Sequence, residues 1–84
     1  MTTVQSGPRI KVLSWNVNGL GDKIKREVVS QFITQHSLDV VLLQETHMRG
    51  TALRALDRGG YRMAAHSGST MGSRGVGILF KKTL

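Results

Sequence analysis

The chain has 84 residues and no cysteine, so it holds one small domain at most and has neither disulfides nor thiolate metal ligands. Twelve Lys+Arg against five Asp+Glu give a formal net charge of +7, which favours polyanions such as nucleic acid as partners, although a solvated basic surface is the other explanation. The polar start MTTVQSGPR and the lack of a long apolar run argue against a signal peptide or a membrane span, and predict an intracellular protein.

The first predicted element is a strand. Residues 1–9 are polar and are expected to form a flexible tail ahead of a domain over residues 10–84. The sequence RIKVLSWNV, residues 9–17, alternates its side chains between two sides in the way that is typical of a strand. The Asn-Gly pair in the NGLG that follows indicates a turn.

A helix and a second strand come next. Asp22 is expected to cap a helix that runs to about Gln35, with Lys25 and Arg26 facing solvent. The spacing of its apolar residues predicts a single apolar stripe made of Ile24, Val28, Val29, Phe32 and Ile33. The unbroken apolar run at residues 40–43 is typical of a strand covered on both faces, and the order strand, helix, strand predicts a parallel crossover.

The second half of the chain is less regular. Residues 51–60 are expected to form one or two helical turns that end at the Gly-Gly pair. Residues 61–65 and 76–80 predict two further strands that pair antiparallel. The fold class that follows is α/β. One helix and these strands leave the sheet with unpaired edges and an uncovered face, so we expect the chain to self-associate.

Polar residues at the ends of the first two strands form the candidate site. In a parallel pair the carboxyl ends meet at one rim, which places Asn16 and Asn18 beside Gln44 and Glu45. Glu45 suits Mg²⁺, which takes one or two protein carboxylates and leaves its other positions to water and substrate phosphate. Gly19 allows a sharp turn and the close approach of a ligand. A simple Asn-Gly turn and a solvated strand end are the alternative interpretations.

Four motifs occur in order along the chain: SWNVNGL, a basic helix containing KIKR, DVVLLQETH and RGVGILF. Over residues 10–80 they resemble the opening third of the endonuclease/exonuclease/phosphatase superfamily, and most of all the apurinic-like endonuclease domains of LINE-type retrotransposons. The resemblance implies a four-layer α/β sandwich, of which this chain would be the N-terminal part. It also implies Mg²⁺-dependent hydrolysis of DNA phosphodiester bonds, which is a nicking endonuclease activity.

The resemblance assigns roles residue by residue. Asn16 matches the asparagine beside the scissile phosphate, and Glu45 matches the metal-binding glutamate. Asn18, expected to face the phosphate, stands where many repair endonucleases have aspartate, and retroelement domains often keep asparagine there. Arg74 is expected to contact the DNA backbone, with a solvated loop arginine as the alternative. His47 also follows the retroelement pattern, and we interpret it as a structural or surface imidazole.

Other parts of the family mechanism have no match in this sequence. That mechanism needs a histidine paired with an aspartate, an Asp-x-Asn pair that positions water, and a tyrosine on the phosphate. His36 and His66 stand in other contexts, and Tyr61 is interpreted as a packing residue. We therefore expect the N-terminal part of a longer protein, or a truncated product, that is inactive by itself, because one Mg²⁺ ligand without a general base gives little rate enhancement.

The resulting hypothesis is the N-terminal portion of a DNA endonuclease that uses Mg²⁺, with Mn²⁺ able to substitute, and that is nuclear if it belongs to a retrotransposon. Three alternatives stay open. One is a non-catalytic module that self-associates through its open sheet. Another is a binder that attracts nucleic acid through charge alone. The third is a phosphatase or phosphodiesterase of the same superfamily, since the early motifs are shared.

Overall fold

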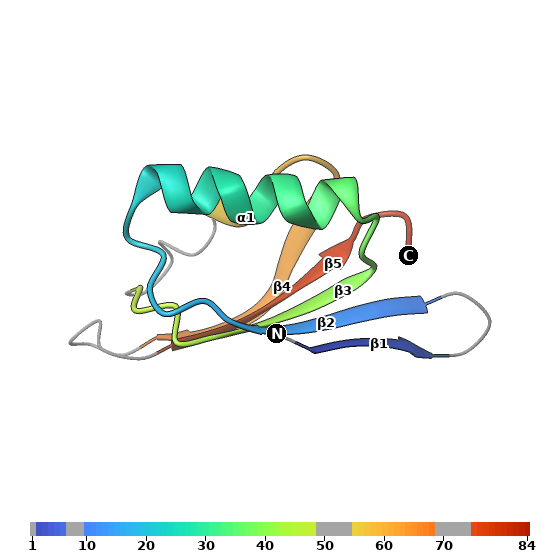
Figure 1. Cartoon of the computed structure of the whole chain (residues 1–84), viewed down its shortest axis with the longest axis horizontal. Coiled ribbons are helices and arrows are strands. Elements are labelled where there is room, and N and C mark those ends of the chain that lie inside the picture. The colour runs from blue at the N-terminus through green and yellow to red at the C-terminus, as the bar shows by residue number, and fades with distance from the viewer. Residues whose placement is uncertain (1, 7–9, 49–54, 69–74) are drawn as a thin grey trace.

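The computed structural model describes residues 2–6, 10–48, 55–68 and 75–84. They form a five-stranded mixed sheet in the order β1-β2-β3-β5-β4, with one helix across one face (Figure 1). The elements are β1 (Thr2–Ser6), β2 (Ile10–Asn16), α1 (Lys23–Gln35), β3 (Val40–Gln44), β4 (Tyr61–Gly68) and β5 (Gly75–Lys81). The α/β class is confirmed, and the arrangement is that of part of an α/β sandwich.

The predicted strand-helix-strand unit is confirmed. Asp22 caps α1 by accepting a hydrogen bond of 2.9 Å from the backbone amide of Ile24. The helix returns the chain so that β2 and β3 pair in parallel, with Asn16 opposite Gln44 at their carboxyl ends. Both strands therefore end at the same edge of the sheet, where the candidate site was predicted.

The second half forms the predicted antiparallel pair. β4 and β5 pair with a register shift between Met63 and Ala65, and β5 inserts between β4 and β3. Of the expected helical turns at residues 51–60, residues 51–54 lie outside the described part of the chain. The positive φ angles of Gly59 and Gly60, 62° and 86°, turn the chain into β4.

The N-terminal segment differs from the expected flexible tail. Thr2–Ser6 form β1, which pairs antiparallel with β2. Without it, the outer edge of β2 would present unpaired backbone amides and carbonyls, and Thr2, Thr3 and Val4 are β-branched residues that favour a strand. A polar composition concealed this tendency, because an edge strand needs little apolar surface.

The core lies between α1 and the sheet. The register aligns Leu13 of β2, Val41 of β3 and Leu79 of β5 across the face that α1 covers. Trp15 meets Phe32 of α1 edge to face, with ring centroids 5.1 Å apart. The buried apolar residues are Leu13, Val17, Leu20, Val29, Ile33, Leu38, Val41, Leu43, Met48, Leu56, Tyr61 and Leu79.

The predicted stripe of α1 is buried along only one side. Val29 and Ile33 are buried, whereas Ile24 and Val28 are 71% and 56% exposed. At about 100° per residue the five apolar positions span roughly 180° of the helix, and a sheet contacts a narrower part than that. The predicted apolar stripe therefore spans a wider arc of the helix than the sheet covers. No helix in the described ranges is long and apolar enough to cross a membrane.

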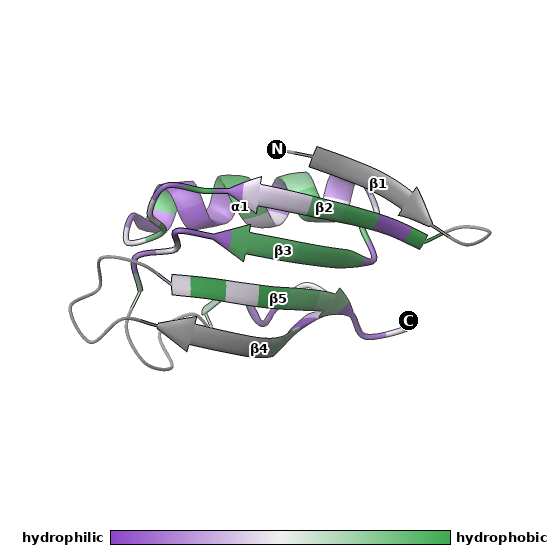
Figure 2. Ribbon diagram, turned by 90° about the horizontal axis from the view of Figure 1, so that it is seen from below, coloured by the Kyte–Doolittle hydropathy of each residue, from purple (hydrophilic) through white to green (hydrophobic). Residues whose placement is uncertain are grey.

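The sheet face opposite α1 carries apolar side chains. Val76 and Ile78 of β5 and Ile10 of β2 are 48%, 38% and 38% exposed. Figure 2 shows this face toward the viewer with α1 behind the sheet. The prediction that β3 is covered on both faces holds only for the α1 side, because no described element lies over the other one.

Asp39 joins three strands at the end of the sheet that is opposite to the candidate site. Its carboxylate accepts a hydrogen bond of 2.8 Å from the backbone amide of Lys11 and lies 3.6 Å from Lys81 Nζ. Its backbone also bonds to Lys11 O and to Lys81 N, at 2.9 and 2.8 Å. The Lys11 amide above all, and then the charge of Lys81, hold the pKa of Asp39 below its ordinary value.

We predict that Asp39 makes stability depend on acid pH. Because its folded pKa lies below the unfolded value of about 4, its contribution is present above that value and is lost as pH falls through the folded pKa. Asp39→Asn should therefore be less stable than wild type at neutral pH and approach it in acid, measured by urea unfolding. Asp57→Asn removes the same charge as a control. A difference for Asp39→Asn that does not change with pH would contradict this assignment.

Candidate functional site

Asn16 and Glu45 meet where β2 and β3 end. Asn16 is the last residue of β2, and Glu45 directly follows β3. The side-chain amide of Asn16 donates a hydrogen bond to Oε2 of Glu45. Both residues are exposed, and the Glu45 side chain keeps 51% of its surface open to solvent. The structure thus brings the two predicted site residues into contact and leaves one carboxylate oxygen, Oε1, free of the amide.

Backbone hydrogen bonds continue the pairing beyond the two strands. Val17 N donates to Gln44 O, Gly19 N to Glu45 O and Leu20 N to Thr46 O, at 3.0, 2.7 and 2.8 Å. Thr46 N in turn donates to the Gly75 carbonyl at 3.1 Å, which ties the loop to the start of β5. The two loops therefore form one frame, and the Asn16–Glu45 contact is held by neighbours on both sides.

Left-handed backbone conformations gather in this frame. Asn18, Glu45 and His47 have φ angles of 51°, 53° and 56°, and Gly19 has 97°. Asn18 also donates its backbone amide to Asn16 Oδ1 at 3.2 Å, which is an Asx turn. The turn interpretation of the asparagines is therefore correct locally. Left-handed non-glycine residues are uncommon, and their concentration at one place is typical of functional sites.

Two cations of α1 brace the first loop. Lys25 Nζ donates to the Asn18 carbonyl at 3.2 Å, and Arg26 donates to the carbonyls of Leu20 and Gly21, both at 2.9 Å. These side chains were expected to face solvent, and instead both are half-buried. The sequence could not show this, because the contact depends on the loop folding back over the first turn of the helix.

The oxygen ligands at this rim suit a divalent cation whose other coordination positions are filled by water and substrate phosphate. The described residues contain no group of three or more His, Cys, Asp or Glu side chains that could hold a metal. Glu45 by itself offers one free carboxylate oxygen beside an amide. That fits Mg²⁺, which commonly takes one or two carboxylates and completes its octahedron with water and phosphate oxygens.

The other predicted residues are placed as follows. Asn18 is exposed at the same rim, while Arg74 lies outside the described residues. His36 follows α1, where its ring stacks on Phe32 with centroids 4.1 Å apart, so it is structural. Tyr61 is buried, as its interpretation as a packing residue required.

His47 is closer to the site than its interpretation as a structural or surface imidazole suggested. Its Nε2 lies 3.9 Å from Glu45 Oε1, and that nitrogen is buried with no hydrogen-bond partner among the described residues. Its Nδ1 would be 3.3 Å from a Cβ added at Gly19. The spacing of two residues from Glu45 was the available signal, but in a regular strand such residues share a face without their side-chain tips meeting.

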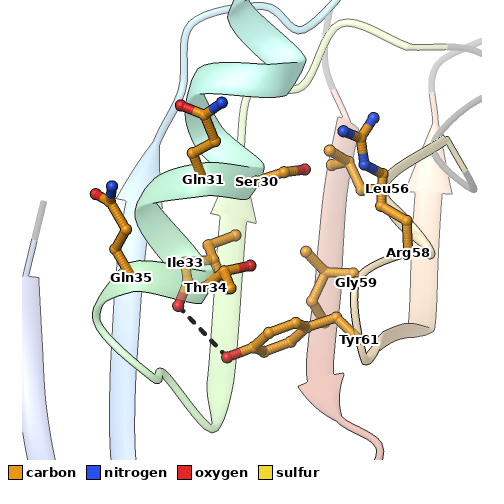
Figure 3. A pocket seen from close by; sticks show the side chains of 10 residues that line it. Ser30, Gln31, Ile33, Thr34, Gln35, Leu56, Arg58, Gly59 and Tyr61 are labelled. Carbon is orange, nitrogen blue, oxygen red and sulfur yellow. Dashed lines mark hydrogen bonds between the residues drawn. The ribbon is translucent and has the colours of Figure 1, made fainter.

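A pocket of about 240 Å³ lies away from this site, between α1 and the start of β4 (Figure 3). Its lining residues are Ser30, Gln31, Ile33, Thr34, Gln35, Leu56, Arg58, Gly59, Tyr61 and Leu79. At one end the Tyr61 hydroxyl donates to the Leu38 carbonyl and lies 3.4 Å from the Ile33 carbonyl. The lining contains no carboxylate or imidazole, and the volume is below the roughly 300–1,000 Å³ usual for small-molecule sites.

Comparison with known proteins agrees with this geometry. The Endonuclease/Exonuclease/phosphatase family matches residues 13–84, and the chain belongs to that family. The chain is also similar to a probable RNA-directed DNA polymerase from the transposon X-element of Drosophila melanogaster. The two are 39% identical over 41 residues, which make up 49% of this chain and 4% of that protein. Both findings confirm the resemblance drawn from the four motifs.

We predict that Gly19 cannot be replaced without loss of stability. An added Cβ would press on His47 Nδ1, and φ of 97° is unfavourable for any L side chain. Gly19→Ala should lower the free energy of unfolding by roughly 1–3 kcal/mol, measured by urea denaturation. Gly21→Ala is the matched control, because nothing lies within 4 Å of its Cβ position. Equal losses in the two variants would contradict the close packing of Gly19 against His47.

Proposed function

We propose that this chain supplies the phosphate- and metal-binding rim of a Mg²⁺-dependent DNA endonuclease. The contact between Asn16 and Glu45 carries this proposal. It joins an amide and a carboxylate at the carboxyl ends of two parallel strands, which is where open α/β sheets bind ligands. Membership of the Endonuclease/Exonuclease/phosphatase family supports a reaction at a phosphodiester bond.

Each side chain at the rim has a distinct task in this proposal. Glu45 offers Oε1 to the cation, while Asn16 holds Oε2 and keeps the carboxylate at a constant angle. Asn18, which follows in the Asx turn, presents its side-chain amide to the substrate phosphate. A bound Mg²⁺ would act as a Lewis acid on a phosphate oxygen, and Mn²⁺ would substitute because it accepts the same oxygen ligands. Arg74 is proposed to contact the DNA backbone.

DNA is the substrate that the charge favours. The formal net charge of +7 attracts polyanions, and the transposon relative is described as an RNA-directed DNA polymerase. If the chain belongs to a retrotransposon protein, that protein would act in the nucleus. A phosphatase or phosphodiesterase of the same family would use the same rim on a smaller phosphoester, and a panel of substrates distinguishes the two.

We predict weak Mg²⁺ binding that depends on Glu45. One carboxylate and an amide should give a dissociation constant of about millimolar or weaker, because Mg²⁺ also relies on substrate phosphate. Glu45→Gln keeps the size of the side chain and should abolish binding, measured by isothermal titration or by competition with Mn²⁺. Glu27→Gln on α1 removes the same charge away from the site and should leave binding unchanged. If both variants bind alike, Glu45 is not the ligand.

The same variants test catalysis in a plasmid-nicking assay. The histidine-aspartate pair and the Asp-x-Asn pair of the family mechanism have no match in this sequence, so we expect this chain alone to give no measurable nicking of supercoiled DNA with Mg²⁺. Nicking that disappears in Glu45→Gln but persists in Glu27→Gln would show that the chain is active by itself, contrary to this expectation. Nicking that neither variant changes would indicate that the site is misplaced.

Self-association is a second proposal, and the exposed apolar side chains of the open sheet face favour it. We predict that Ile78→Lys shifts the chain toward monomer in sedimentation velocity, because a charged side chain disfavours burial of that face against a second copy. Ile24→Lys on the outer side of α1 introduces the same charge at a residue that is 71% exposed and is the control. A wild-type chain that is monomeric at high concentration would refute the proposal.

A further inference from the structure

The Glu45 carboxylate has a defined neighbour on each oxygen. Oε2 accepts a hydrogen bond from the Asn16 amide, and Oε1 is 3.9 Å from Nε2 of His47. Asn16 reaches Glu45 from β2, whereas His47 reaches it from two residues farther along the same loop. The carboxylate therefore lies between an amide at one oxygen and an imidazole at the other.

The imidazole is held by the backbone around it. Thr46, between Glu45 and His47, is 1% exposed, and its amide and carbonyl bond to Gly75 O and Leu20 N. His47 has a left-handed φ of 56°, and its Nε2 lies 3.9 Å from Glu45 Oε1. Its ring also packs against Gly19, where a Cβ would be only 3.3 Å from Nδ1. These contacts restrain the imidazole from the backbone side.

The Nε2 atom is buried and has no hydrogen-bond partner within the described part of the chain, although the His47 side chain as a whole is 33% exposed. A buried polar atom without a hydrogen bond is unfavourable, and Glu45 Oε1 lies 3.9 Å from this nitrogen. An imidazole that carries its hydrogen on Nε2 would donate to that oxygen after a movement of about 1 Å, since N–H···O distances are usually near 2.9 Å. Asn16 bonds only to Oε2, so a small rotation of the carboxylate about that contact would bring Oε1 to Nε2.

We propose that His47 is a positioning residue, which with Asn16 holds the Glu45 carboxylate at the angle needed to bind the metal. The inference rests on the proposed function in taking Glu45 as the ligand. Partners that hydrogen-bond a ligating carboxylate orient it, and their removal commonly weakens metal binding by about 10- to 100-fold. His47 is not itself required to touch metal or substrate.

Two variants of equal length separate positioning from packing. His47→Gln retains an N–H donor at the end of the side chain, whereas His47→Met has a methyl group there. Neither residue is β-branched, so the strain at φ of 56° is matched. We would measure Mn²⁺ binding to the whole chain by electron paramagnetic resonance, and the order of the Glu45 side chain without metal by ¹³C relaxation. Urea unfolding would check that both variants fold.

His47→Met should weaken Mn²⁺ binding by about 10-fold or more and make the metal-free Glu45 side chain more mobile, while His47→Gln stays near wild type in both measurements. Equal affinities in all three proteins would overturn the proposal, as would equal losses in the two variants. If wild type binds no Mn²⁺, the metal part of the proposed function fails, and the mobility of Glu45 alone then decides whether His47 positions it.

Discussion

Parallel pairing between β2 and β3 brings the ends of both strands to one edge of the sheet, and backbone hydrogen bonds continue that pairing as far as Leu20 and Thr46. All the polar residues of the candidate site depend on this constraint. Asn16 and Glu45 are 29 positions apart in sequence, and α1 is the connection that makes a parallel neighbour out of β3. Without this crossover the two strands would not pair in parallel, and the Asn16 amide and the Glu45 carboxylate would not be brought together.

The two faces of the sheet divide the roles of stability and interaction. One face packs Leu13, Val41 and Leu79 against α1 and forms the core. The opposite face exposes Val76 and Ile78, and its register brings Ser14 and Gln44 into a hydrogen bond of 2.7 Å close to the site. The rim thus lies next to an exposed apolar surface. A neighbour placed there would exclude water from one side of Glu45 and strengthen its electrostatic interactions.

Patterns that depend on neighbouring residues predicted the elements well. Asp22 capped the helix as expected, and the apolar run at residues 40–43 formed a strand. Predictions that depend on what covers a residue were less accurate. Ile24 and Val28 were expected on one apolar stripe and are exposed, because one sheet contacts only part of the apolar side of α1. The segment Thr2–Ser6 was expected to be flexible and forms an edge strand, because the free edge of β2 was not evident from composition.

The sequence by itself determined which groups are available: Asn16, Asn18 and Glu45 around the ends of two predicted strands, and a glycine where the chain turns. These follow from local patterns, since residue type and spacing decide strands, caps and turns. The tertiary structure alone decided the distances. It brought His47 Nε2 to 3.9 Å from Glu45 and folded Lys25 and Arg26 back onto the first loop. Such contacts depend on left-handed backbone angles and on segments remote in sequence, and no local pattern encodes how two loops fit together once their strands have paired.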